Sequence, residues 1–564
     1  MSSPDGLRAA VRAWIADDPD AGDQAELRDL LDKDAEAELA DRFAGRLSFG
    51  TAGLRGVVAA GPNRMNRAVV RAATAAVAAW LLAAAHEPAG VVVGCDARHR
   101  SAQFADEVAR VLAGAGIAVH VLPLPCPTPL LAFAVRHLHL AAGVMVTASH
   151  NPARDNGYKL YLSDGAQVIP PADREIEARI ATLGPLAQIP VADASSPLIT
   201  RHGDEIAAAY LDRIAAPAGG AAPASGAAPA GGGEPALTVV YTPMHGVAGR
   251  LMLRAIDAAG FAPPQVVAAQ AEPDPDFPTV AFPNPEEPGA LDLALADARR
   301  LAVDLVIAND PDGDRLAVAV PGPDGWRTLT GDQLGSLLGA AQLRWTAGSA
   351  GHRLAATTIV SSTMLARIAV SAGVEFAQTL TGFKWIARAA DAKPGTRLVF
   401  GYEEALGYAV GDVVRDKDGI SAALAMLRLA TEAKAAGRSV PDLYDDLETA
   451  HGVHLTSQLT LRTAEPAAVM ARVRADPPGS FGQEPVTSMT DLADGKDGLP
   501  PSDVLIFRLD GARVVLRPSG TEPKIKCYVE VVRPLAGRPL AAARAAAASA
   551  MTPLHAALAA VLAD

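Results

Sequence analysis

Short apolar runs that end in small or polar residues recur along the chain and predict strands followed by loops. The run Val144–Val146 stops at Thr147-Ala-Ser-His-Asn-Pro152, which suits a tight exposed loop. Helix-like stretches such as Ala102–Ala113 lie between the runs, and the chain up to Phe43 has the pattern of amphipathic helices. This alternation predicts parallel or mixed sheets covered by helices on both faces.

Three of these strand, turn and helix patterns resemble one another. They begin at Val91, Leu237 and Ala356, so they are separated by about 120 to 145 residues, which is the length of a domain rather than of a solenoid repeat. We therefore expect three related α/β domains. A length of 564 residues predicts roughly three to five domains in all.

Composition narrows the classes of function. A net charge of -13 argues against nonspecific nucleic-acid binding, which needs a basic face. The three cysteines are far apart and include no C-x-x-C pair, which predicts neither a zinc site nor a disulfide framework and favours the cytoplasm. The first residues lack a signal-peptide pattern, and the apolar run Ala72–Ala85 is short and rich in alanine, so no membrane span is expected. The segment from about 215 to 235 is almost entirely Ala, Gly and Pro and is expected to be a flexible insertion.

The clearest chemical signal follows the predicted strand Leu301–Ala308. Asp310, Asp312 and Asp314 alternate there, so an extended loop would place their carboxylates on one side. Such carboxylates repel one another unless a cation is present, and Mg²⁺ suits them. The spacing excludes an EF-hand, and the remaining alternative is an acidic surface turn.

Other polar clusters have a plain structural interpretation beside the functional one. Ser149 would lie at a strand's carboxyl end, where open α/β sheets bind ligands, as a nucleophile or as part of an ordinary turn; the pattern is not G-x-S-x-G. Phe49–Gly56 is either a flexible anion-binding turn with Arg55 as donor or a glycine-rich loop with a solvated arginine. Asp155–Lys159 is expected to be a turn that brings Lys159 near Ser149.

Two later stretches have the same ambiguity. Glu403 and Glu404 suit hydrogen bonds to vicinal hydroxyls, or they form a solvated acidic pair. Arg517–Lys524 combines Arg, hydroxyls, a Gly amide and Lys, which a phosphate dianion needs, and otherwise is a plain turn.

Together these residues closely resemble the α-D-phosphohexomutase family of phosphoglucomutases and phosphomannomutases, especially its branch with G-Y-E-E-A-L-G-Y in the sugar loop. Four motifs occur in the family's order: the phosphoserine loop Thr147–Pro152, the metal loop Asp310–Arg315, the sugar loop Gly401–Gly407 and the phosphate loop Arg517–Thr521. The resemblance implies an α/β protein of four domains around a central cleft, with the first three alike in mixed-sheet topology and the fourth a distinct α+β domain. The expected limits are 1–206, 207–320, 321–445 and 446–564.

The resemblance also implies the roles of individual residues. The implied catalytic residues are Ser149, His150, Arg55, Lys159 and Lys417, with phosphate carried on Ser149 and a positive charge from Arg55 and His150. The implied Mg²⁺ ligands are Ser149, Asp310, Asp312 and Asp314. A lysine among cations would have the lowered pKa that a base requires. The implied substrate contacts are Arg315, Thr381, Gly382, Lys384, Glu403, Glu404, Arg517, Ser519, Gly520, Thr521 and Lys524.

The implied activity interconverts the 1-phosphate and 6-phosphate of glucose or mannose, with a sugar bisphosphate as intermediate and activator. The implied protein is a cytoplasmic monomer or weak dimer whose partners are sugar phosphates, with no nucleic acid or membrane. Ala405 stands where many phosphoglucomutases have a serine. This difference leaves open which sugar phosphate is the preferred substrate. The alternatives are a phosphopentomutase or phosphodeoxyribomutase and a sugar 1,6-bisphosphate synthase. A phosphatase and a non-catalytic sugar-phosphate sensor are disfavoured because the phosphate loop, Ser149 and all three aspartates are present.

Overall fold

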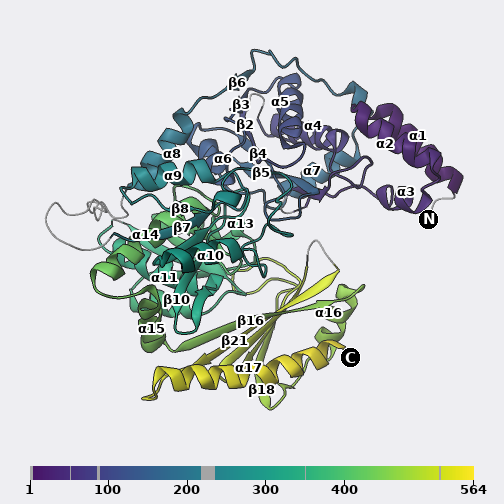
Figure 1. Ribbon diagram of the computed structural model, residues 1–564. Helices are drawn as coiled ribbons and strands as arrows, with labels where there is room; N and C mark the ends of the chain where they lie inside the picture. The colour runs from purple at the N-terminus through teal and green to yellow at the C-terminus, as the bar shows by residue number, and fades with distance from the viewer. Residues whose placement is uncertain are drawn as a thin grey trace. The chain divides into compact units, whose positions relative to one another are not determined.

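The structure is a computed structural model that describes residues 4–50, 53–85, 89–216, 236–349, 351–519 and 523–563 (Figure 1). The predicted insertion at about 215–235 lies almost wholly outside the described residues. The chain divides into two compact units, the first formed by Met1–Pro321 with Gly407–Leu427 and the second by Gly322–Leu406 with Arg428–Asp564.

The first unit opens with three amphipathic helices, as the sequence predicts, followed by a mixed sheet of order β1-β5-β4-β2-β3-β6. Strands β4, β2, β3 and β6 run parallel, whereas β5 is antiparallel to both β4 and β1. The strands are β1 Leu54–Val57, β2 Val91–Cys95, β3 Val119–Val121, β4 Ala142–Val146, β5 Asp155–Leu162 and β6 Ile199–Arg201. The helices are α1 Pro4–Asp17, α2 Ala21–Asp32, α3 Glu36–Arg42, α4 Arg67–Ala84, α5 Ser101–Gly114, α6 Thr128–His137, α7 Ala172–Ala181 and the short η1 Leu186–Gln188.

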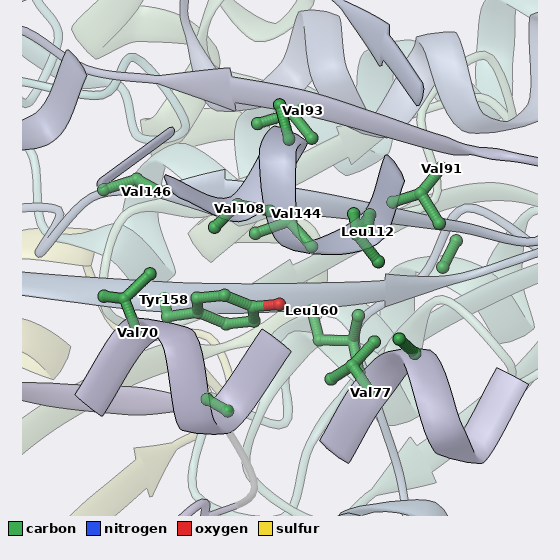
Figure 2. Close-up of a cluster of buried hydrophobic side chains, with 14 of the residues drawn as sticks. Val70, Val77, Val91, Val93, Val108, Leu112, Val144, Val146, Tyr158 and Leu160 are labelled. Carbon is green, nitrogen blue, oxygen red and sulfur yellow. The ribbon is translucent and has the colours of Figure 1, made fainter. Parts of the chain in front are cut away.

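Helices pack against this sheet through branched apolar side chains. In Figure 2, Val70 and Val77 of α4 lie beside Tyr158 and Leu160 of β5, and all four belong to one buried cluster. Every residue of β2 and of β4 is buried, which explains why both appear in the sequence as continuous apolar runs.

A second sheet in the first unit repeats this arrangement on a smaller scale. Strands β8, β7 and β9 are parallel neighbours, and β10 is antiparallel to β9. The strands are β7 Val239–Thr242, β8 Gln265–Val266, β9 Leu305–Ala308 and β10 Ala317–Gly322, with helices α8 Glu205–Ala215, α9 Gly249–Ala258, η3 Ala268–Gln270 and α10 Asp292–Leu301. Strand β15 Gly407–Val410 and the first part of α14 Gly419–Ala435 also belong to this unit.

The second unit contains a third parallel arrangement, β13-β12-β14. Its strands are β11 Gly325–Thr328, β12 His352–Thr358, β13 Glu375–Thr379 and β14 Thr396–Glu403, with helices α11 Gly331–Trp345, α12 Met364–Ser371, α13 Phe383–Ile386 and α15 Val440–His451.

The same unit ends in a different architecture, an antiparallel sheet of order β16-β21-β20-β19-β18-β17. Its elements are β16 Val453–Arg462, α16 Pro466–Ala475, β17 Ser480–Phe481, β18 Glu484–Asp491, β19 Leu505–Leu509, β20 Ala512–Pro518, β21 Lys524–Arg533 and α17 Leu540–Ala563. Helix α17 packs against this sheet through residues such as Leu554 and Leu558. The predicted fold class, three related mixed α/β domains and a distinct α+β domain, is confirmed.

The order of strands confirms the three repeats. The neighbours β3-β2-β4, β8-β7-β9 and β13-β12-β14 are equivalent, and the patterns noted at Val91, Leu237 and Ala356 coincide with β2, β7 and β12. The loops that begin near Thr147, Asn309 and Glu404 therefore follow the equivalent third strand of each repeat. This is the carboxyl edge at which open α/β sheets bind ligands.

Three local predictions were wrong. Asp155–Lys159 is not a turn but the first part of β5, and Gly157 lies there because a Cβ would approach the backbone oxygens of Thr147 and Leu54 to 2.6 and 2.8 Å. The predicted turn at Phe49–Gly56 becomes strand β1 from Leu54 onward. The strand predicted from Leu301 begins only at Leu305, because α10 continues to Leu301 and ends at Ala302 in the left-handed conformation.

Two described helices, α4 and α17, are long and apolar enough by composition to cross a membrane. Both are core helices, since α4 contributes residues such as Val70 and Val77 to the first core and α17 contributes Leu554 and Leu558 to the last.

Candidate active site

Ser149 lies in the loop after β4, where its hydroxyl is directed at an acidic cluster from another repeat. Its Oγ donates to Asp310 Oδ2 at 3.0 Å and lies 3.2 Å from His150 Nδ1. The residue is 3% exposed and has a φ of +55°, a left-handed conformation that non-glycine residues adopt rarely. Strained backbone of this kind persists only where the surroundings hold it in place.

Arg98, which was not predicted from the sequence, helps to fix the backbone of the serine loop. Its guanidinium donates to the backbone oxygens of Ser149 at 2.6 Å and Asn151 at 2.7 Å, and also to those of Pro152 and Asp155. The arginine is 4% exposed, and its Nε lies 3.1 Å from Asp96 Oδ2. The Asp-x-Arg spacing just after β2 was the only available signal.

The three aspartates converge, as their alternation predicts. One oxygen from each of Asp310, Asp312 and Asp314 lies within 4.8 Å of the others, and all three residues are 0% exposed. Burial, together with the charges of Asp312 and Asp314, raises the pKa of Asp310 well above its usual range. Burial also acts to raise the pKa of Asp312, but the Lys159 ammonium and the hydrogen bonds of neighbouring side chains, including Thr128, together outweigh burial and lower it.

The donor set fits a hard divalent cation. Asp312 Oδ1 and Asp314 Oδ1 are buried oxygens that have no hydrogen-bond partner among the described residues. An unpaired carboxylate oxygen is costly to bury, so their convergence is best explained by a ligand that accepts several oxygen donors. The acidic surface turn considered from the sequence is excluded, because the loop is buried.

Two lysines contact the acidic cluster from different elements. Lys159 of β5 donates to Asp312 Oδ2 at 2.7 Å and to Asp314 Oδ2 at 3.1 Å. Lys417, in the loop between β15 and α14, lies 3.3 Å from Asp314 Oδ2.

Asp416, which the sequence analysis missed, positions Lys417. Its carboxylate accepts from Tyr161 Oη at 2.7 Å, from Gln167 Nε2 at 2.8 Å and from Lys417 Nζ at 3.3 Å. Asp416 is 0% exposed, and nothing in the charged string Arg415–Asp418 distinguishes it in advance.

Two electrostatic expectations were wrong. Burial acts to lower the pKa of Lys159, but Asp312 and Asp314 outweigh it and the pKa is raised, because the lysine lies among carboxylates rather than among cations. Burial and then the positive charges of Arg315 and Arg55 hold the pKa of His150 well below its usual range. The imidazole is therefore neutral at physiological pH and supplies a hydrogen-bonding nitrogen, not a charge.

The predicted arginines of the first unit lie beside these groups. Arg55 of β1 donates to Asn151 Oδ1 at 3.0 Å, so it reaches the serine loop. Arg315 donates its backbone N–H to Asp310 Oδ1 at 3.0 Å, while its guanidinium lies 3.3 Å from Glu286 Oε2.

In the second unit, Glu403 is the last residue of β14 and Glu404 is the first residue after it. Glu404 accepts from Ser361 Oγ at 3.0 Å and from Thr358 Oγ1 at 3.2 Å, and desolvation raises its pKa. Through these contacts, Glu404 connects the end of β14 to the end of β12 and the loop that follows it. Thr381 and Gly382 precede the short helix α13, where Lys384 lies over the Trp385 ring at 5.6 Å and is 6% exposed.

The predicted phosphate loop lies at the turn between β20 and β21. Arg517 is partly exposed near the end of β20. The backbone N–H of Ser519 donates to the Lys524 oxygen at 2.8 Å, which closes the base of the turn. Gly520 and Thr521 lie outside the described residues.

Comparison with known proteins agrees with this geometry. Sequence profiles for phosphoglucomutase/phosphomannomutase α/β/α domains I, II and III match residues 46–185, 209–323 and 330–450, and the profile for the C-terminal domain matches 461–546.

Individual relatives match along most of their length. A Haemophilus influenzae chain named "Probable phosphomannomutase" is 40% identical over 477 residues, covering 83% of this chain and 93% of that relative. A "Probable phosphoribomutase" of Schizosaccharomyces pombe is 34% identical and covers 93% of both chains. The crystal structure of a phosphoglucomutase/phosphomannomutase family protein from Burkholderia thailandensis has the same fold, with a TM-score of 0.66, 21% identity and coverage of 90% of this chain and 97% of that one.

Three repeated α/β domains with a serine and an acidic cluster at their strand ends, and an antiparallel fourth domain, define a multidomain enzyme of phosphoryl transfer. The chain belongs to the phosphoglucomutase/phosphomannomutase family. It is a phosphosugar mutase, an isomerase of a family that uses Mg²⁺.

Proposed function

We propose that the protein interconverts the 1-phosphate and 6-phosphate of glucose or mannose through phosphate carried on Ser149. The supporting observation is the buried Ser149 hydroxyl, 3.0 Å from Asp310 within an acidic cluster that fits a divalent cation. Phosphoryl transfer depends mainly on positioning and on neutralising charge, and the acidic loop would provide both if it held a divalent cation beside Ser149.

The reaction would consist of two transfers of opposite direction. In the first, the bond between phosphorus and Ser149 Oγ breaks and a bond to the free sugar hydroxyl forms, while that hydroxyl loses its proton and Ser149 Oγ takes one up. The product is a sugar bisphosphate. After it reorients, the bond from the original phosphate to the sugar breaks and that phosphorus bonds to Ser149 Oγ, while Ser149 Oγ loses its proton and the released sugar oxygen takes one up.

Residues of the first unit would have distinct tasks in these steps. Asp310, Asp312, Asp314 and a phosphate oxygen on Ser149 would hold Mg²⁺, which supplies positive charge to the transferring group. Arg55 would add a guanidinium, and the neutral His150 a hydrogen bond. Lys159 and Lys417 are the candidates for moving the proton or positioning the hydroxyl, and Asp416 holds Lys417 in place.

Residues of the second unit, together with Arg315, would recognise the sugar phosphate. We propose Glu403 as the main contact to the sugar hydroxyls, with Glu404 acting through Ser361 and Thr358. The other proposed contacts are Thr381, Gly382, Lys384, Arg517, Ser519, Gly520, Thr521 and Lys524. We further propose domain limits of 1–206, 207–320, 321–445 and 446–564, and a cytoplasmic monomer or weak dimer.

A pentose phosphate is the second candidate substrate. Relatives named phosphopentomutase from Mus musculus and Homo sapiens are 33% and 32% identical and match about as much of the chain as a Staphylococcus aureus phosphoglucomutase does at 33%. Rates with glucose 1-phosphate, mannose 1-phosphate and ribose 1-phosphate, each with and without the matching bisphosphate, will separate the candidates. Net release of bisphosphate would instead identify a synthase.

The role of Ser149 is tested by Ser149→Ala, which removes the hydroxyl but keeps a Cβ on the same left-handed backbone. We expect complete loss of turnover in a folded protein, and mass spectrometry should find phosphate on Ser149 of the wild type only. Ser48→Ala, at an exposed serine of the same unit, is the matched control. Mutase activity in Ser149→Ala would refute the mechanism.

A further inference from the structure

A cavity in the first unit is lined by cationic and aromatic side chains. It measures about 430 Å³, and its lining includes Arg136, His137, His139 and Arg213, with Phe133 on one side. None of these residues belongs to the serine loop or the acidic cluster. The volume suits a small molecule, since ligand pockets typically measure about 300 to 1,000 Å³.

The cations converge on this cavity from different elements. Arg136 and His137 lie in the last turn of α6, His139 follows that helix, and Arg213 lies in the last turn of α8. A helix C-terminus favours nearby cations. The helix dipole therefore explains why basic residues lie at the end of α6 and at the end of α8, each considered separately. It does not account for two such ends opening into one cavity of a chain whose net charge is -13.

The charges in the cavity are only partly balanced by acids. Within the described ranges, no ion pair to a carboxylate is found for Arg136 or Arg213, and His137 stacks on Phe133 at 5.1 Å. Arg136 donates to the backbone oxygens of Asp412 and Val413. Burial is the largest influence on the pKa of Arg136 and lowers it, and the positive charges of Arg415 and Arg213 act in the same direction against those of Asp412 and Asp164.

We propose that this cavity binds a small phosphorylated anion at a site separate from the catalytic centre. Arg213 and His139 are exposed and able to donate to phosphate oxygens, and the partly buried Arg136 adds a further positive charge to the lining. The Phe133 and His137 rings would contact the apolar part of the same ligand. The inference is independent of the proposed function, because it uses none of the residues assigned to the mutase reaction.

Calorimetric titration of the full chain with inorganic pyrophosphate, in the presence of a metal chelator, tests this site. The wild type should show one more binding site than Arg213→Glu, or an affinity at one site that is at least about tenfold higher, because charge-assisted contacts become repulsive. Arg174→Glu is the matched control, since it makes the same charge change at an exposed helical residue of the same unit, outside the cavity.

Two further variants separate the possible explanations. His139→Asn keeps a residue that tolerates the φ of +53° and should weaken the same site, and Arg517→Ala should leave it intact because Arg517 belongs to the predicted phosphate loop. Identical titrations for Arg213→Glu and Arg174→Glu would overturn the proposal. Failure of the mutase assignment would leave the titration result unchanged.

Discussion

At the scale of single residues, the acidic loop combines charges that folding alone does not balance. Asp310, Asp312 and Asp314 are fully buried, and two of their oxygens lack a hydrogen-bond partner among the described residues. Ion pairs with Lys159 and Lys417 offset part of this cost. A bound cation would offset the rest of the cost of burying these carboxylates. The protein should therefore be more stable with the cation than without it.

Asp312→Asn should lower activity by orders of magnitude while the protein remains folded. The amide removes one of the charges that balance a divalent cation, and it also reduces repulsion among the carboxylates when no cation is bound. Mg²⁺ should therefore raise the melting temperature of the wild type but raise that of Asp312→Asn much less, because a ligand stabilises the state that binds it. Thermal unfolding with and without Mg²⁺ measures this, with the exposed Asp324→Asn as control. Full activity of Asp312→Asn in chelator would contradict the assignment.

Arg98→Lys tests the residue that fixes the serine loop. Lysine keeps the charge but cannot bond four backbone oxygens with a planar fork, so the loop should lose about 2 kcal/mol of hydrogen bonding. We expect kcat to fall with little change in KM, and phosphorylation of Ser149 to become slower. Arg110→Lys also loses a contact to a backbone oxygen, that of Ala192, but far along the chain from this loop, and should keep normal kinetics. Equal kinetics in both variants would show that Arg98 only supports folding.

At the scale of elements, a buried ion-pair network joins the loop after β12 to the last sheet. Glu530 of β21 accepts from Ser362 Oγ at 2.9 Å and from the Thr363 N–H at 2.7 Å, and lies 3.0 Å from Arg513 Nη2. Arg513 in turn donates to the backbone oxygens of Ile359 and Ser361. Burial alone would raise the pKa of Glu530, but Arg513, the nearby His454 and the Thr363 N–H lower it to about 2.

This lowered pKa predicts how stability depends on pH. A carboxylate whose pKa is lower in the folded state contributes stability that is present above its ordinary pKa, near 4.5, and is lost as the pH falls toward 2. Glu530→Gln should therefore cost about 3 kcal/mol at pH 7 and progressively less below pH 4.5. Urea denaturation of both proteins from pH 7 to pH 2.5 measures the difference, so that contributions from other carboxylates cancel. The control Glu465→Gln, at an exposed residue, should have a free energy of unfolding close to that of the wild type at every pH.

At the scale of the whole molecule, charge is distributed unevenly. The chain has a net charge of -13, yet the predicted phosphate contacts Arg517 and Lys524 are cationic, as are Arg55 and Lys159 of the serine and acidic loops. A net negative charge disfavours nonspecific binding of polyanions, while local cations would retain a small anionic substrate. Ser149 and Arg517 belong to different compact units, so kinetics can show whether both act on the same substrate.

Arg517→Ala should raise KM and lower kcat together while leaving Ser149 able to be phosphorylated. A charge-assisted bond to the phosphate that is not transferred would position the sugar in both reaction directions. Arg517→Lys should restore little, because it lacks the planar fork. Steady-state kinetics of both variants, with Arg508→Ala at an exposed residue of the same sheet as control, measures the effect. An unchanged kcat/KM in both Arg517 variants would remove this loop from the mechanism.

The sequence by itself determined the repeats and the positions of the chemistry. Continuous apolar runs such as Val91–Val93 and Val144–Val146 identify buried parallel strands, because both faces of those strands are covered by helices. Alternating aspartates at 310, 312 and 314 identify the acidic cluster, because alternate side chains of an extended segment share a face.

Only the tertiary structure decided which local signals apply and what each charge contacts. Asp155–Lys159 contains the residues of a turn, yet its glycine serves close strand packing, which depends on Thr147 and Leu54. The pKa of Lys159 is raised because strand β5 places it against Asp312 and Asp314, more than 150 residues along the chain. Arg98 and Asp416 were missed for the same reason, since their partners are brought together only by folding. Short-range patterns fix elements, whereas the electrostatics of a buried site depends on long-range contacts that no local pattern contains.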